Sequence, residues 1–179
     1  MISITQKTLQ DLEFETILQT IASRCNTDIG ETKALAIAPI NDKTELLINL
    51  QQTAEYLSSF SNNNVIPNHG FENIDYELKF LAIEDSFLEV ASFKKISNLT
   101  ETAITLIQFL KKFETYYPNL FQRTTSIECV KLIIQRIDEV IDKFGIIKDN
   151  ASPDLIDIRR SINVVRGKIN QSFGMALSQ

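Results

Sequence analysis

Residues 137–173 read IDEVIDKFGIIKDNASPDLIDIRRSINVVRGKINQSF, and this stretch decides the fold because it holds a stop, a short extended run and a strong helix start. Ser152 is a favourable N-cap, because its side-chain oxygen can accept from the unpaired N–H groups of a first helical turn. Pro153 falls at the first helical position, where its missing N–H costs nothing. Asp154 adds negative charge at the positive end of the helix dipole. The pattern predicts a helix that begins at Pro153.

That helix carries one narrow apolar seam, flanked by basic residues. The spacing of three and four residues is typical of a coiled-coil contact. The seam consists of Leu155, Ile158, Ile162, Val165, Ile169 and Phe173, and the flanking cations are Arg159, Arg160, Arg166 and Lys168. The cations could make weak phosphate contacts along DNA, but charges beside such a seam more often set partner choice. The aromatic residues that single-strand binders interleave with cations are missing, so a protein contact is the favoured interpretation.

The run before this helix, Phe144 to Lys148, has no room for a helix of its own. It predicts a tight turn with at most one short β-pair near 144–149. We therefore expect Gly145, Ser152 and Pro153 to form a cap and hinge. A helical domain would span residues 1–150, and the final helix would begin at 151 and run to 179.

Apolar periodicity elsewhere is almost wholly helical. All four prolines fall between elements or at their starts, which agrees with the boundaries that the periodicity sets. The third predicted helix, over residues 42–60, has a buried stripe of Leu46, Leu50, Ala54 and Leu57. The long fifth helix, over residues 86–117, has an inward face of Phe93, Ile96, Leu99, Ala103, Leu106, Phe109, Leu110 and Phe113. The sixth helix, over residues 125–142, has an inward face of Ile127, Val130, Ile134, Ile137 and Ile141. The predicted helices span residues 8–25 (with Thr8 as the start), 28–38, 42–60, 74–81, 86–117 and 125–142.

Composition fits one helical domain with an arm. The 179 residues include 44% hydrophobic and 23% charged residues, and the net charge of −5 gives no general attraction for nucleic acid or anionic membranes. Cys25 and Cys129 each lie in an apolar helical pattern, so two buried thiols in a reducing cytoplasm are expected rather than a disulfide. We find no secretory signal and no segment that would span a membrane.

No catalytic constellation can be assembled from these residues. The Gly-rich phosphate loop of ATP-binding proteins is absent. The one histidine, His69, lies in a turn, where a local hydrogen bond is the usual role. Asp138 and Asp142 share a helix face and could hold a divalent ion, although a solvated acidic face is the commoner arrangement. The sequence therefore predicts no enzyme, cofactor or metal site within the chain itself.

Three stretches together resemble the MutS family of mismatch-repair-like ATPases, specifically its bacterial type-II branch. The first runs from Leu12-Glu13-Phe14 through Cys25, Thr27, Gly30 and Ala34, and the second is Pro39 with Thr53-Ala54-Glu55-Tyr56. The third and most specific runs from Gly145 to Arg160 and includes Ala151-Ser152-Pro153, Leu155 and Ile158-Arg159-Arg160. The chain reaches its first such stretch within about a dozen residues of Met1, which favours the type-II branch.

The resemblance implies that this chain is the N-terminal helical core of a longer protein, with the last helix as the start of a lever leading to a DNA clamp. It implies an ATPase that binds ATP and Mg²⁺, forms a homodimer and precedes a nuclease domain in many members, all outside these residues. It also implies DNA as a partner, in junction binding or restraint of recombination, and in some bacteria the ribosome.

A second hypothesis is a free-standing helical module whose seam recruits a partner helix. Under either hypothesis, we expect the distal seam to fray after about Ile169 or to pair with a second copy, because exposed apolar stripes tend to associate.

Overall fold

The computed structural model describes residues 4–128 and 130–177, and within them the only regular elements are helices and one isolated bridge. The all-α prediction is therefore confirmed for the described residues. The helices are α1 (Gln6–Asp11), α2 (Phe14–Ala22), α3 (Asp28–Leu35), α4 (Lys43–Ser58), α5 (Asp75–Leu81), α6 (Val90–Lys112), α7 (Pro118–Thr124), α8 (Lys131–Val140) and α9 (Pro153–Leu177).

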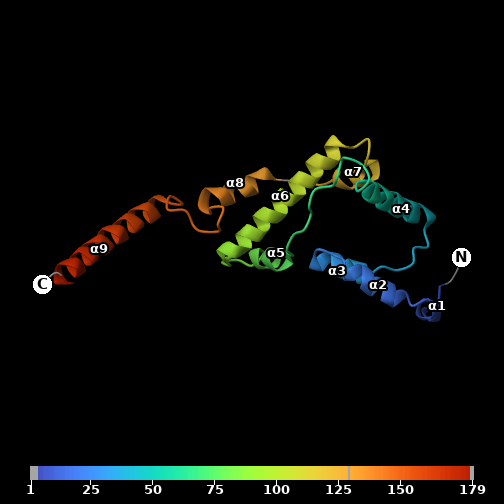
Figure 1. Cartoon of the computed structure of the whole chain (residues 1–179), viewed down its shortest axis with the longest axis horizontal. Coiled ribbons are helices and arrows are strands. Elements are labelled where there is room, and N and C mark those ends of the chain that lie inside the picture. Colours follow the sequence, from blue (N-terminus) through green and yellow to red (C-terminus); the bar gives the residue numbers. More distant parts are fainter. Residues whose placement is uncertain (1–3, 129, 178–179) are drawn as a thin grey trace.

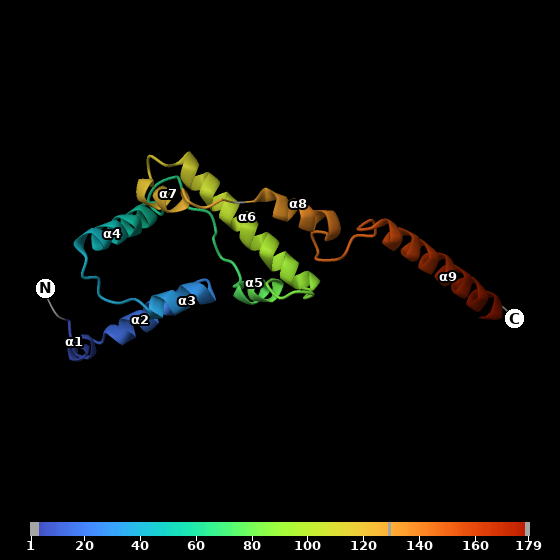
Figure 2. The same cartoon turned by 180° about the vertical axis from the view of Figure 1, so that it is seen from behind.

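The helices form an extended molecule rather than one built around a central core. Helices α1 to α3 contact one another at one end, while α6 contacts α7 and α8 in the middle and α4 contacts α7. Helix α9 projects from the opposite end, and the two ends of the chain lie far apart (Figure 1). The reverse view shows the same separation (Figure 2). The predicted division at residue 150 stays a prediction.

Tyr117 is the best-buried side chain of the middle region, with no exposed surface. Its ring stacks on Phe109 of α6 with centroids 5.9 Å apart. Its hydroxyl donates to the carbonyl oxygen of Asn64 at 2.6 Å and lies 3.1 Å from Asn62 Oδ1. These contacts fasten the loop after α4 to the junction of α6 and α7.

A carboxylate joins α4 to the start of α7. Glu55 accepts hydrogen bonds from the backbone N–H groups of Asn119 and Leu120, both at 2.9 Å, and from Asn119 Nδ2 at 2.6 Å. The N-cap of α7, Tyr117, makes no side-chain capping bond. Glu55 therefore supplies from another helix the cap that the first turn of α7 lacks.

A second carboxylate cluster lies beside α5 and α6. Glu77 is buried, and Lys95 Nζ lies 3.6 Å from its Oε1 and 3.4 Å from Glu72 Oε2. The hydrogen bond with Glu72, together with the negative charges of Glu77 and Glu72, raises the pKa of Lys95 above its ordinary value. Lys95 therefore stays charged and offsets the burial of Glu77.

Three predicted helices have different bounds in the structure. The first is two helices, because Glu13 has a left-handed φ of 51° between α1 and α2. Its N-cap is Thr5 rather than Thr8, since Thr5 Oγ1 accepts from the Thr8 N–H at 3.2 Å. The predicted helix 86–117 ends at Lys112, and Pro118 begins the unpredicted α7. The predicted helix 125–142 is only α8, from Lys131, so Ile127 and Val130 precede it and are exposed.

The predicted buried stripe of α4 is wrong. Leu46, Leu50, Ala54 and Leu57 are all exposed, and no residue of α4 is buried. The side of α4 that meets α7 is polar and is formed by Gln52 and Glu55. By contrast, the whole predicted inward face of α6 is buried or half-buried, as are Ile134, Ile137 and Ile141 around α8.

The two cysteines have different outcomes. Cys25 is a free, half-buried thiol that donates weakly to the Ile21 carbonyl at 3.5 Å, so it is less buried than expected. Cys129 lies outside the described residues.

Candidate functional site: helix α9 and its root

The turn before α9 is organised by Asp142. Its carboxylate oxygen accepts from the N–H groups of Phe144 and Ile146, both at 2.9 Å. Gly145 has a φ of 77°, a left-handed conformation that glycine adopts at little cost. Ile141 and Ile147 form an antiparallel bridge across the turn. The turn with one short β-pair that the sequence predicted at this place is therefore present.

Two further contacts tie this turn to the helices on either side. The Lys148 ammonium donates to the carbonyl oxygen of Asp138 near the end of α8. The Asp149 carboxylate forms an ion pair with the Arg159 guanidinium, one and a half turns into α9. These charged contacts therefore connect the turn to the end of α8 and to the first turns of α9. The sequence analysis did not predict this pair, although a carboxylate ten residues before an arginine, across a turn, was a usable signal.

The first turn of α9 has the N-cap and the first residue that the sequence predicted. Ser152 Oγ accepts from the Leu155 N–H at 3.2 Å, and the Ser152 carbonyl accepts from the Ile156 N–H at 3.2 Å. Pro153 is the first helical residue. A helix with this cap does not need packing against the body to define its start.

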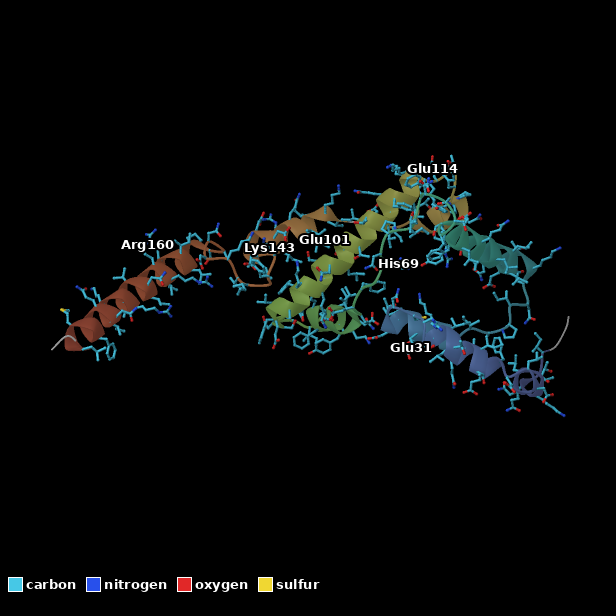
Figure 3. All side chains as sticks on the ribbon, viewed as in Figure 1. Glu31, His69, Glu101, Glu114, Lys143 and Arg160 are labelled. Atoms are coloured by element: carbon cyan, nitrogen blue, oxygen red, sulfur yellow. The ribbon has the colours of Figure 1, made fainter. Side chains whose placement is uncertain are left out.

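The apolar seam of α9 is open to solvent beyond its first member. Leu155 is half-buried, whereas the next five members have exposed fractions between 49% and 65%. Figure 3 shows the α9 side chains extending into solvent, with no other described segment beside the distal part of the helix. The body therefore leaves the seam available for a partner.

The four candidate phosphate-binding cations do not act as one group. Arg159 is paired with Asp149, and Arg160 lies 3.7 Å from Asp157 on the same helix. Arg166 and Lys168 are exposed, and no described residue forms an ion pair with either of them. Half of the positive charge is thus neutralised locally.

The remaining candidates have local partners. His69, labelled in Figure 3, lies with Nδ1 3.0 Å from the Pro67 carbonyl oxygen and Nε2 3.4 Å from the Tyr56 hydroxyl. The Asp142 carboxylate is used by the turn, so it does not pair with Asp138 in an ion site. Among the described residues, no group of three or more His, Cys, Asp or Glu side chains could hold a metal ion. No helix in that part of the chain is long and apolar enough to cross a membrane.

The fold and site define an all-helical protein segment whose candidate site is a helix face rather than a cavity. No family model matches the chain. It is similar to proteins named Endonuclease MutS2: 26% identical to that of Alkaliphilus oremlandii over 182 residues, covering 98% of this chain and 23% of the relative. It is 27% identical to that of Lacticaseibacillus casei, covering 93% and 21%, and 25% identical to that of Staphylococcus aureus strain Newman, covering 94% and 22%.

All three of these relatives have the same name, Endonuclease MutS2, and the similarity to each extends over nearly the whole of this chain. The chain spans about a fifth of the length of the curated relatives that it matches.

Proposed function

We propose that this chain is the N-terminal structural and allosteric segment of a MutS-like, ATP-dependent DNA-binding protein. In this proposal the body carries no catalytic group. Helix α9 is the first part of a lever that transmits movement between an ATPase and a DNA clamp, both encoded elsewhere. The type-II branch is the favoured one, because the similar proteins are named Endonuclease MutS2.

One observation carries the proposal. The similarity extends over nearly the whole of this chain but covers only about a fifth of each relative. The large accessible surface of the chain also supports the proposal. The chain presents 14,109 Å² of accessible surface, whereas a compact monomer of 20.4 kDa presents about 8,800 Å². A chain with so much uncovered surface is suited to packing against further segments.

The root of α9 suits a mechanical role. Four local contacts hold it: the Asp142 turn, the Lys148 contact, the Asp149–Arg159 pair and the Ser152 cap. A helix held at one end and free at the other can transfer a rotation without local chemistry.

The whole protein would bind ATP and Mg²⁺ in its ATPase, act as a homodimer in the cytoplasm and contact branched or junction DNA. The role of the full-length protein would be processing of junction or branched DNA, restraint of recombination, or action on ribosomes, with nuclease activity where a nuclease domain follows.

The alternative function is a free-standing module that recruits a partner helix, and the open seam of α9 favours it. The coding sequence separates the two. A reading frame that continues past Gln179 into a Gly-rich phosphate loop supports the MutS-like proposal. A stop codon directly after Gln179 would overturn it in favour of the module.

A further inference from the structure

A group of aromatic and aliphatic side chains is exposed where α5 leads into α6, at the edge of the middle region (Figure 1). Tyr76 and Phe80 lie one turn apart on α5, and their rings stack with centroids 5.6 Å apart. Tyr76 is 67% exposed, Ile83 58% and Phe87 81%. We call these four residues the α5 face. Grouped apolar exposure of this kind is typical of a surface that a partner covers.

The turn that carries Ile83 and Phe87 is held by hydrogen bonds. Ser86 Oγ donates to the Phe80 carbonyl oxygen at 2.7 Å, and the Ser86 N–H donates to the Ile83 carbonyl oxygen at 3.2 Å. Asp85 has a left-handed φ of 59°, which aspartate adopts more readily than most residues. An aromatic side chain on an ordered backbone loses little conformational freedom on binding, so Phe87 is suited to anchor an interface.

The carboxylates around the α5 face are mostly without a cation. Residues 72–94 contain six acidic residues and only two basic ones. Glu72 and Glu77 share the ammonium of Lys95, at 3.4 Å and 3.6 Å. No described residue forms an ion pair with the other four carboxylates, which are all exposed: Asp75, Glu84, Asp85 and Glu89. The α5 face is therefore bordered by uncompensated negative charge.

We infer that the α5 face binds an arginine-rich segment of another protein. This goes beyond the proposed function and does not rest on it, because it concerns only residues 72–94. A guanidinium group stacks favourably on an exposed ring such as that of Tyr76 or Phe87. It also forms paired hydrogen bonds with a carboxylate such as that of Glu84 or Asp85.

The combination of rings and carboxylates selects this partner over others. A neutral apolar segment would cover the rings but leave the carboxylates without a cation. Nucleic acid would place its phosphates beside the carboxylates, and the like charges would repel. An arginine-rich segment satisfies both features at once, because each guanidinium has a flat face for a ring and N–H groups for a carboxylate.

The first experiment measures the binding of a fluorescein-labelled nona-arginine peptide to the 179-residue chain by fluorescence anisotropy at physiological salt. The peptide should bind saturably. Nona-lysine has the same charge but no planar group to stack on a ring, so it should bind about fivefold more weakly. Raising the salt concentration should widen this difference, because salt screens exposed charges more than it weakens ring contacts.

The second experiment removes the anchor. Phe87→Ser should weaken nona-arginine binding about fivefold, since it removes a ring from the α5 face. The variant should fold normally, because Phe87 is 81% exposed. Phe144→Ser is the matched control: Phe144 is 76% exposed in the turn before α9, and its loss should leave the affinity unchanged.

The third experiment removes the charge. Glu84→Gln, Asp85→Asn neutralises two carboxylates and keeps at position 85 a residue that tolerates a left-handed φ. This variant should bind both peptides more weakly. Glu45→Gln, Glu114→Gln is the matched control, since both residues are exposed and Glu114 follows the opposite end of α6 from α5 (Figure 3). The control should lose much less affinity.

Four results would overturn the inference. The first is no saturable binding of nona-arginine, and the second is equal affinity for nona-lysine, which would reduce the interaction to general charge attraction. The third is a loss of affinity in either control that equals the loss in its test variant. The fourth is binding by this chain that disappears in the protein of the complete reading frame, because a later part of the same protein would then cover the α5 face.

Discussion

At the scale of single residues, Glu55 connects two parts of the chain that are distant in sequence. Its carboxylate binds two N–H groups and a side-chain amide of α7, about 64 positions away in sequence. Hydrogen bonds from neutral donors to a charged acceptor stabilise more than those between neutral groups. The contact of α4 with α7 is therefore polar, with Glu55 making most of its hydrogen bonds and Gln52 adding one.

We expect Glu55→Gln to loosen the first turn of α7. The amide has one acceptor oxygen and would turn its NH₂ group toward an N–H donor, at a cost of about 1.5–3 kcal/mol. Amide hydrogen exchange at Leu120 should accelerate roughly 10- to 150-fold if that cost is local. Glu114→Gln, at an exposed residue between α6 and α7, is the control and should leave this exchange unchanged. Equal exchange in both variants would show that Glu55 is not the cap.

A substitution at Gly145 would test the turn at the root of α9. Its φ is 77°, and an added Cβ would meet no atom within 4 Å, so the cost of alanine there is purely conformational. We expect Gly145→Ala to destabilise the turn by about 1 kcal/mol, seen as faster exchange of the Asp142 and Lys148 amides. Gly70→Ala, where the nearest atom lies at 3.5 Å and φ is not left-handed, should not do so. A Gly145→Ala turn that exchanges no faster would contradict the left-handed assignment.

At the scale of elements, α9 should behave as an independent unit. Gly167 lies within α9 with open space around its Cα, and alanine favours a helix interior over glycine by about 0.8–1 kcal/mol. Gly167→Ala should therefore raise the helical circular dichroism signal and slow exchange within α9. The thermal unfolding of α4 to α8 should be unaffected, because α9 does not pack on them. A matching rise in their melting temperature would show that α9 is part of the body.

The sequence predicted those features that depend on local spacing and capping. The inward face of α6 and the helix start at Pro153 follow from spacing and capping, which are local properties. The sequence analysis failed where a contact is polar and joins residues that are distant in sequence, because no local pattern around Glu55 indicates its contact with Asn119. It also failed at Glu13, where a non-glycine residue takes a left-handed conformation, and at Pro118, where no helix was predicted but α7 begins. At the candidate site, the seam and cap were predictable, whereas the Asp149–Arg159 pair required the folded turn.

At the scale of the whole molecule, charge limits what the isolated chain can bind. The net charge is −5, and two of the four cations of α9 are paired with carboxylates. We expect duplex DNA to bind no tighter than about 10 µM at physiological salt, in the range of non-specific binding. Fluorescence anisotropy would measure it, with Arg166→Ala as the test variant. Submicromolar binding that Arg166→Ala and Arg159→Ala leave unchanged would contradict this expectation.

We also expect the isolated chain to show no turnover of ATP and no cleavage of DNA, because its sequence has no phosphate loop and the described residues assemble no catalytic group. Activity that persists through purification and is removed by a point substitution within these 179 residues would contradict this.

The central claim is that α9 transmits a signal through its root. The most direct measurement is the rate of ATP hydrolysis, with and without branched DNA, by the protein of the complete reading frame and by its Gly145→Ala, Ser152→Ala variant. Both substitutions loosen the root, so the variant should keep the DNA-free rate and lose most of the response to DNA. A response equal to that of the wild type, in a variant whose root amides exchange faster, would contradict the account.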